Sequence, residues 1–218
     1  MVIAIDGPAG SGKSTIAKLL AQKLRDGEGR GFTYINTGNL YRAVTLGCLR
    51  ADIAPDDGEK VLVYAKNAKI EYNGDRVILN GEDVTDQLHT DEIDRRAAPL
   101  SANVPVRHVI NDLIRAIADG INTVAEGRDM TSVVFPDAGH RFYLDASVQA
   151  RTRRRYEQGV SKLSPEEIEA AIIRRDEIDK NKEEGSLTVA PGTVYIDTSG
   201  LTIEQVYDIL VGEIEQVN

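Results

Sequence analysis

Short apolar segments alternate with longer amphipathic ones along most of the chain. Residues 2–5 are uniformly apolar, as in strands that are buried on both faces of a parallel sheet. From Ser14 to Leu24, apolar side chains instead recur at helical spacing. Further strands are predicted at residues 34–35, 122–125, 141–144 and 194–196, and further helices at 41–49 and from Ile203 onward. This order predicts an α/β fold with a doubly wound parallel sheet.

Residues 68–85 break this alternation. Three short strand-like segments, at 68–72, 76–80 and 83–85, are separated by the dipeptides Asn73-Gly74 and Asn80-Gly81. Asn-Gly favours tight hairpin turns because both central residues adopt positive φ. We therefore predict a small antiparallel sheet inserted into the α/β domain.

A second departure covers residues 151–182, which are rich in charge and poor in large apolar side chains after Tyr156. Ser164 followed by Pro165 predicts a helix start there, because serine caps the first turn and proline suits its first position. Two interpretations fit this segment. It is either a solvated helical hairpin or a mobile, lid-like cover over a site.

Composition and charge exclude several classes. The chain has 218 residues, which suits one domain, and a formal charge of −9, which argues against a general binder of nucleic acid. A small anion in a local basic pocket remains compatible with that charge. Cys48 is the only cysteine, so an intramolecular disulfide is impossible and a reducing, cytoplasmic location is expected. We see neither an export signal nor an apolar segment that could span a membrane.

Residues 7–14 read GPAGSGKS and match the phosphate-binding pattern G-x-x-x-x-G-K-[ST] in full, between a predicted strand and a predicted helix. Main-chain N–H groups can turn around an anion here, and the helix N-terminus adds partial positive charge. Lys13 would reach the β and γ phosphates of a nucleoside triphosphate, and Ser14 would ligate Mg²⁺. A glycine-rich turn that happens to hold a lysine is the alternative. The expected nucleotide-binding residues are Gly7, Pro8, Ala9, Gly10, Ser11, Gly12, Lys13, Ser14 and Thr15.

Arginines concentrate where a second phosphate could bind. Arg42 and Arg128 follow predicted strands and should lie at the carboxyl edge of the sheet, where ligands bind in open α/β folds. A further cluster of arginines lies later in the chain. Ion pairs with glutamates account for some of these arginines, and the others could stabilise charge on a γ-phosphate during transfer. That cluster comprises Arg151, Arg153, Arg154, Arg155, Arg174 and Arg175.

Other nucleotide-driven classes fit less well. A GTPase-type switch predicts N-K-x-D after a strand, whereas residues 181–184 read NKEE and lie in a charged segment. ATP-driven mechanical proteins are usually longer because they need elements that couple to partners. A small P-loop domain with two insertions and separated arginines favours a small-molecule kinase.

Nearly the whole chain resembles the bacterial-type cytidylate kinase family. The resemblance is carried by residues 3–14, 37–38, 41–42, 77–85, 127–130, 133–138 and 175–179. The phosphate-binding motif is widely shared, whereas VILNGEDVT at 77–85 and the central GRDM and VVFPDA segments are specific to the family. The resemblance implies Mg²⁺-dependent transfer of the ATP γ-phosphoryl group to CMP or dCMP. We expect a monomer that binds neither nucleic acid nor membrane.

The resemblance also implies residue roles and regions. The phosphate of the acceptor would be held by Arg42 and Arg128, and the cytosine amino group would be read by Asp129 with the help of Arg107. The expected substrate-binding residues are Thr37, Tyr41, Arg42, Ser101, Arg107, Arg128, Asp129, Arg175, Asp179 and Lys182, and the expected catalytic residues are Lys13, Arg128, Arg151, Arg154 and Arg155. One domain would comprise a core at about 1–37, 96–150 and 183–218, an acceptor-binding region at about 38–95 and a lid at about 151–182.

A carboxylate at Asp129 suits cytosine, because it accepts a hydrogen bond from the N4 amino group where uracil presents a carbonyl oxygen. Sites of this kind discriminate by roughly 10⁴-fold. An ion pair with Arg128 or a contact with Mg²⁺-bound water is the alternative role. A kinase for another monophosphate or small metabolite, which the insertion disfavours, and a non-catalytic nucleotide-binding regulator also stay open.

The chain departs from the family pattern at four positions. Asn36 stands where the family has aspartate, His89 and Lys182 stand where it has arginine, and Thr131 stands where it has glycine. Lys182 keeps a positive charge but lacks the bidentate fork of arginine, so a phosphate contact there would be weaker.

Overall fold

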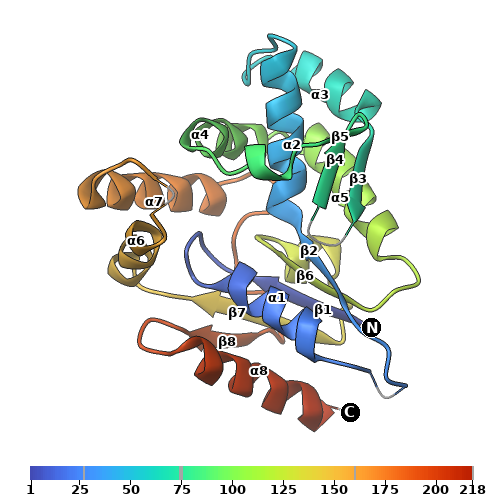
Figure 1. Cartoon of the computed structure of the whole chain (residues 1–218), viewed down its shortest axis with the longest axis vertical. Coiled ribbons are helices and arrows are strands. Elements are labelled where there is room, and N and C mark those ends of the chain that lie inside the picture. The colour runs from blue at the N-terminus through green and yellow to red at the C-terminus, as the bar shows by residue number, and fades with distance from the viewer. Residues whose placement is uncertain (27, 74–75, 160, 218) are drawn as a thin grey trace.

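Five parallel strands form the main sheet of the computed structural model, in the order β2-β6-β1-β7-β8 (Figure 1). The structure describes residues 1–26, 28–73, 76–159 and 161–217. The strands are β1 (Val2–Asp6), β2 (Thr33–Asn36), β6 (Thr123–Gly127), β7 (His140–Asp145) and β8 (Val194–Asp197). The chain leaves β1 in one direction toward β2 and later crosses to β7 on the other side. This reversal places a crevice at the carboxyl end of β1, and the predicted fold class is confirmed.

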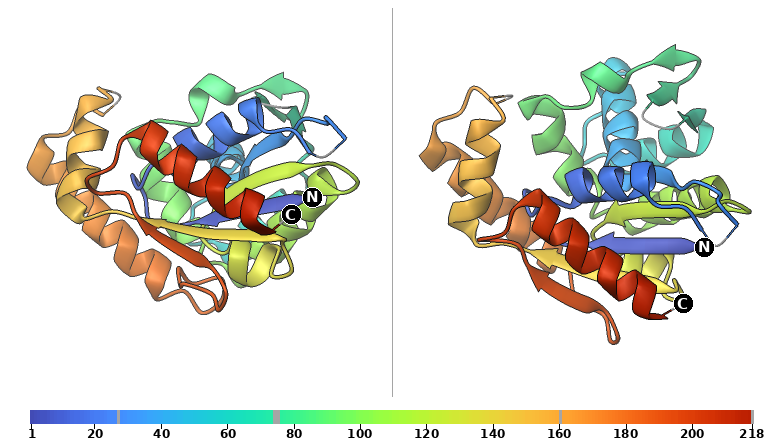
Figure 2. Two further views of the ribbon diagram at one scale, coloured as in Figure 1. Left: turned by 90° about the horizontal axis from the view of Figure 1, so that it is seen from below. Right: turned by 60° about the horizontal axis from the view of Figure 1, so that its bottom comes forward.

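Alternate residues of β1 enter two separate cores. Ile3 and Ile5 pack with apolar residues of α1 (Lys13–Lys23) and α8 (Ile203–Val217), which cover one face of the sheet (Figure 2). Ala4 belongs to the core on the opposite face of the sheet. Because successive side chains of a strand point to opposite faces, a strand buried on both sides needs an unbroken apolar sequence, as residues 2–5 have.

The opposite core is built by α2 (Thr37–Arg50), α3 (Gly58–Asn67), α4 (Asp91–Leu100) and α5 (Val104–Ala118). The second predicted helix, at 41–49, was too short at its start. Its first turn is polar yet buried, and the Thr37 hydroxyl donates to the main-chain oxygen of Glu126 at 2.8 Å. Thr37 therefore faces the end of β6, and Leu40 is the first residue of this helix that enters the apolar core, so the polar residues before it gave no helical pattern.

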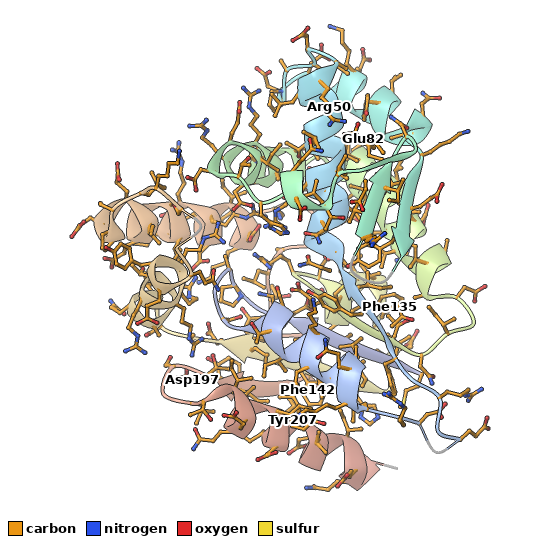
Figure 3. All side chains as sticks on the ribbon, viewed as in Figure 1. Arg50, Glu82, Phe135, Phe142, Asp197 and Tyr207 are labelled. Carbon is orange, nitrogen blue, oxygen red and sulfur yellow. The ribbon has the colours of Figure 1, made fainter. Side chains whose placement is uncertain are left out.

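The inserted antiparallel sheet is confirmed, with strands β3 (Ile70–Asn73), β4 (Arg76–Leu79) and β5 (Glu82–Asp83). Asn80 and Gly81 have φ of 52° and 88°, as a tight turn requires. The other predicted turn, at Asn73-Gly74, extends outside the described residues. The sheet packs on α2, and Arg50 at the end of that helix pairs with Glu82 at 2.8 Å (Figure 3).

The third strand of this sheet is shorter than the predicted 83–85. The Asp83 carboxylate accepts hydrogen bonds from the Thr85 main-chain N–H at 3.0 Å and from its hydroxyl at 2.6 Å. This local turn ends the strand, and residues Thr85–Gln87 form one 3₁₀ turn instead.

The predicted helical hairpin consists of α6 (Val148–Glu157) and α7 (Pro165–Lys180), which pack against each other at one side of the molecule (Figure 1). Ser164 Oγ accepts from the Glu167 N–H at 3.3 Å, and the Glu167 carboxylate accepts from the Ser164 N–H at 2.8 Å. This reciprocal cap explains the sharp start of α7. Among the helices of the described residues, none combines the length and the apolar character needed to cross a bilayer.

Candidate active site

One cleft, of about 1930 Å³, runs along the carboxyl edge of the main sheet. Its walls come from the loop after β1, the first turn of α2, α4, the end of β6, and the helices α6 and α7. Of the predicted site residues, Gly7, Pro8, Arg151 and Asp179 lie outside its lining, and all the others line it. Segments that are far apart in sequence thus meet at one place.

The glycine-rich loop forms a tight cradle between β1 and α1. A Cβ on Gly7 would collide with the main-chain oxygen of Leu144 in β7, so only glycine fits there. Lys13 Nζ donates to the Pro8 carbonyl at 2.7 Å, and burial, together with the positive charge of Arg128, lowers the pKa of Lys13 to about 7. A bound polyphosphate would raise that pKa again, because it brings negative charge to the ammonium.

Ser14 and Glu126 meet beneath the cradle. Ser14 Oγ donates to Glu126 Oε1 at 2.7 Å, and the Tyr34 hydroxyl donates to the same oxygen at 3.3 Å. Within the described part of the chain, no cluster of three or more histidine, cysteine or acidic side chains could cage a metal alone. One hydroxyl and one carboxylate beside a phosphate cradle do fit Mg²⁺, which keeps several waters and takes its remaining ligands from phosphates.

Arg107 and Asp129 form a buried ion pair in the cleft wall, Nη2 to Oδ2. Arg107 Nη1 donates to the Ser101 carbonyl at 2.9 Å, and its guanidinium lies 5.7 Å from the centre of the Tyr41 ring. Burial raises the pKa of Asp129, and the adjacent guanidinium opposes that shift. Asp129 is therefore paired with Arg107 and not with Arg128, which was the sequence-based alternative.

Three cations converge on Asp179, whose side chain is fully buried. Arg128 Nε lies 2.8 Å and Arg175 Nε 3.1 Å from Oδ2, and Lys182 Nζ lies 2.7 Å from Oδ1. Burial opposes ionisation of Asp179, but the three positive charges outweigh it and hold the pKa well below its usual range. Asp179 thereby brings together cations from the residue after β6, from α7 and from the residues that follow α7.

A second carboxylate joins α6 to α2. Asp94 of α4 accepts from Arg42 Nε at 2.9 Å and from Arg155 Nη2 at 2.7 Å. Both arginines line the cleft, so Asp94 fixes two cations that come from opposite walls.

Two arginines of α6, Arg151 and Arg154, contact the glycine-rich loop. Arg151 forms a buried bidentate pair with Asp176 at 3.0 and 2.6 Å and donates to the Ala9 carbonyl at 3.2 Å. Arg154 Nη1 donates to the Thr198 hydroxyl at 3.0 Å and lines the cleft itself. Arg151 thus supports the loop from behind, whereas Arg154 can reach a ligand.

Several polar atoms in this wall have no partner within the chain. Asn39 Oδ1, Tyr41 Oη and Arg107 Nε are buried without a hydrogen-bond partner among the described residues. All three residues line the cleft. Because buried polar groups are usually satisfied, three orphaned groups around one cleft indicate a polar ligand.

A profile of the cytidylate kinase family matches residues 3–216 of the chain. The chain belongs to the cytidylate kinase family. The cytidylate kinase of Caldanaerobacter subterraneus subsp. tengcongensis is 43% identical over 209 residues, covering 94% of this chain and 91% of that protein. That of Thermodesulfovibrio yellowstonii is 41% identical, covering 99% and 98%. A solved, uncharacterized protein from Eubacterium ventriosum, 12% identical over 99% of this chain and 98% of that one, has a TM-score of 0.55, which shows the fold alone.

The four departures from the cytidylate kinase pattern take defined places. Lys182 is buried against Asp179, and His89 lines the cleft, where burial and the nearby Arg42 lower its pKa. The Asn36 main-chain N–H donates to the Tyr72 hydroxyl at 2.9 Å, and the Thr131 hydroxyl donates to Asp6 at 2.6 Å.

Sequence reasoning missed some residues of the cytidylate kinase cleft. Asp94, Tyr72 and Thr198 each line it and bear on its polar contacts, yet none lies in a recognisable motif. Glu126 was not among the predicted site residues, although its place at the end of a buried strand was a usable signal.

Proposed function

We propose that the chain transfers the γ-phosphoryl group of ATP to CMP or dCMP, giving ADP and CDP or dCDP. The observation that carries the proposal is the single cleft, in which a triphosphate cradle faces a buried arginine–aspartate pair across a group of cations. This arrangement suits two nucleotides whose phosphates meet.

The donor nucleotide would lie on the loop Gly7–Ser14, with main-chain N–H groups and Lys13 around its phosphates. When bound, Mg²⁺ supplies charge neutralisation between the phosphate oxygens. Ser14 and Glu126 would hold that ion from the protein side. Catalysis then consists of positioning and charge stabilisation, with no covalent intermediate on the protein.

The acceptor would bind with its base at Asp129 and its phosphate near Arg42 and Arg128. Asp129 accepts from the cytosine amino group, and the unpartnered Arg107 Nε offers a donor to the ring. Arg175 and Lys182 add positive charge from the lid side. Arg154 and Arg155 project from α6 into the cleft, where closure of α6 and α7 would exclude water from the transferring group.

We further propose that the enzyme acts as a monomer in the cytoplasm, because one chain supplies both nucleotide sites and its only thiol, Cys48, is buried. A light-scattering measurement during size-exclusion chromatography that gave a dimer mass would contradict the monomer.

The test is a panel of acceptors, CMP, dCMP, UMP, AMP and dTMP, in a coupled assay for ADP with ATP and Mg²⁺. We expect turnover with CMP and dCMP that exceeds the others by orders of magnitude. A preference for another monophosphate would overturn the acceptor assignment. ATP binding without acceptor-stimulated ADP release would indicate a non-catalytic nucleotide binder.

A further inference from the structure

The segment that follows α7 passes behind the Arg107–Asp129 pair. We name residues 181–187 the post-lid segment. Leu187 N donates to the Asp179 carbonyl at 2.7 Å, and Lys182 Nζ reaches the Asp179 carboxylate at the same distance. Glu184 places both carboxylate oxygens 2.9 Å from His108 Nε2 on α5. Three contacts therefore hold the post-lid segment against the end of α7 and against α5.

Gly185 lies directly on the Arg107–Asp129 pair. It is buried, with φ of +66°, and a Cβ there would overlap the Arg107 guanidinium and lie 2.5 Å from Asp129 Oδ2. Both a left-handed backbone and this close approach require glycine. No other glycine with positive φ in the described residues approaches an ion pair of the cleft in this way.

The Arg107–Asp129 pair consequently lies between the cleft and the backbone at Gly185. Arg107 and Asp129 line the cleft on one side, whereas Gly185 lies behind them and outside the lining. A group that reads a base must be fixed to within about 0.5 Å, and such precision comes from the residues packed behind it. The backbone at Gly185 supplies that packing.

We propose that Gly185 determines acceptor specificity, by letting the post-lid segment hold Asp129 in the position from which it reads the acceptor base. This inference rests on the proposed function. Any side chain at residue 185 pushes the Arg107–Asp129 pair into the cleft or separates the two groups. Gly185 is thus a positioning residue, which acts through Asp129.

Gly185→Ala tests the proposal, with CMP and UMP compared as acceptors at saturating ATP. We expect the CMP-over-UMP ratio of kcat/KM to fall by about tenfold or more, since discrimination depends on one well-placed hydrogen bond. The KM for CMP should rise while the KM for ATP stays unchanged. A purely structural role would not separate the two KM values.

Gly120→Ala is the matched control. Gly120 also has a positive φ, of +70°, but among the described residues no atom lies within 4 Å of the place that its Cβ would take. It therefore carries the same backbone strain without touching the pair. We expect Gly120→Ala to lose only the stability that the left-handed backbone costs, with an unchanged acceptor ratio.

A second variant keeps the test decisive if Gly185→Ala fails to fold. Glu184→Ala releases the contact with His108 and adds no atom near the pair. We expect it to lower the CMP-over-UMP ratio in the same direction. A ratio within about twofold of wild type in the variant that folds would overturn the inference. Wild-type protein without CMP-dependent turnover would instead overturn the proposed function, so the two failures are distinguishable.

Discussion

Asp6 and Thr131 lie 125 residues apart in sequence, and Thr131 donates two of the three hydrogen bonds that the fully buried Asp6 carboxylate accepts. Asp6 Oδ2 accepts from the Thr131 main-chain N–H at 2.7 Å and from its hydroxyl at 2.6 Å, and Oδ1 accepts from the Met130 N–H at 2.8 Å. Asp6 is the last residue before the phosphate loop, and Met130 follows Asp129. One buried carboxylate thus joins the start of the glycine-rich loop to the segment that carries Asp129.

Thr131→Val should weaken the contact between Thr131 and Asp6 and shift the low-pH side of the pH–rate profile to higher pH. Burial raises the pKa of Asp6 to about 6, and the Thr131 hydroxyl opposes the rise. Without the Thr131 hydroxyl the pKa of Asp6 rises further. As the pH is lowered, activity should therefore begin to fall at a higher pH than in wild type. Removing a hydrogen bond to a buried carboxylate should also cost about 1–3 kcal/mol of unfolding free energy. The measurements are pH–rate profiles and urea unfolding.

Thr123→Val is the control for this substitution. The Thr123 hydroxyl is fully buried and has no hydrogen-bond partner in the described structure. Its replacement by an isosteric methyl should leave stability unchanged or improved, with an unchanged pH profile. Equal losses in both variants would show that the Thr131 hydroxyl contributes nothing specific.

Asp6 should also give stability a defined dependence on pH. Its folded pKa, about 6, lies above the ordinary 3.8, so the folded state binds the proton more tightly than the unfolded chain. Its contribution to the unfolding free energy is therefore greatest below about pH 4 and is lost as pH rises through about 6, by about 3 kcal/mol in total. Asp6→Asn should abolish this pH dependence. The difference in unfolding free energy between wild type and Asp6→Asn, followed from pH 4 to 8, measures it. A difference that did not change with pH would contradict the raised pKa of Asp6.

The sequence predicted the sheet, the insertion and the phosphate loop because each depends on local pattern. Residues 2–5 and the Asn80-Gly81 turn carry their structures in a few consecutive side chains. The pairing of Asp6 with Thr131, and of Asp94 with two arginines, depends on how distant elements pack, which no local pattern encodes. Glu184 matters in the sequence only as part of a rejected guanine motif, yet it anchors the post-lid segment on His108.

Lys13→Met should abolish nearly all turnover. It removes the only charge that the cradle residues themselves offer to the phosphates, so we expect kcat to fall by at least about 10²–10³-fold. Lys23→Met is the control, because Lys23 ends the same helix and lies 4.9 Å from the Tyr207 ring, away from the cleft lining. Near-normal ADP production by Lys13→Met in the coupled assay would refute the donor assignment.

Asp129→Asn should narrow the preference for CMP over UMP. An amide keeps an acceptor for the cytosine amino group and gains a donor for the uracil carbonyl, so we expect the ratio of kcat/KM to fall by about 10²-fold or more. The exposed Asp112→Asn, on α5, should leave the ratio unchanged. An unaltered ratio in Asp129→Asn would mean that another residue reads the base.

Asp179→Asn should destabilise the protein strongly. It leaves Arg128, Arg175 and Lys182 without their shared anion in a buried place, and breaking a buried ion pair costs about 3–5 kcal/mol. We expect a markedly lower Tm at pH 7, whereas Asp208→Asn, at an exposed position of α8, should leave the Tm unchanged.

The direction of the Asp179 pKa shift predicts how the loss of stability in Asp179→Asn depends on pH. The folded pKa of Asp179 is held well below its ordinary value of 3.8, so its stabilising contribution is present above about pH 4 and disappears as pH falls through the folded value. The Tm difference between wild type and Asp179→Asn should therefore be full at pH 5–8 and shrink below pH 4. A difference that stayed constant down to pH 2.5 would show that the three cations do not depend on the Asp179 charge. In that case packing alone would have to hold α7 against the end of β6.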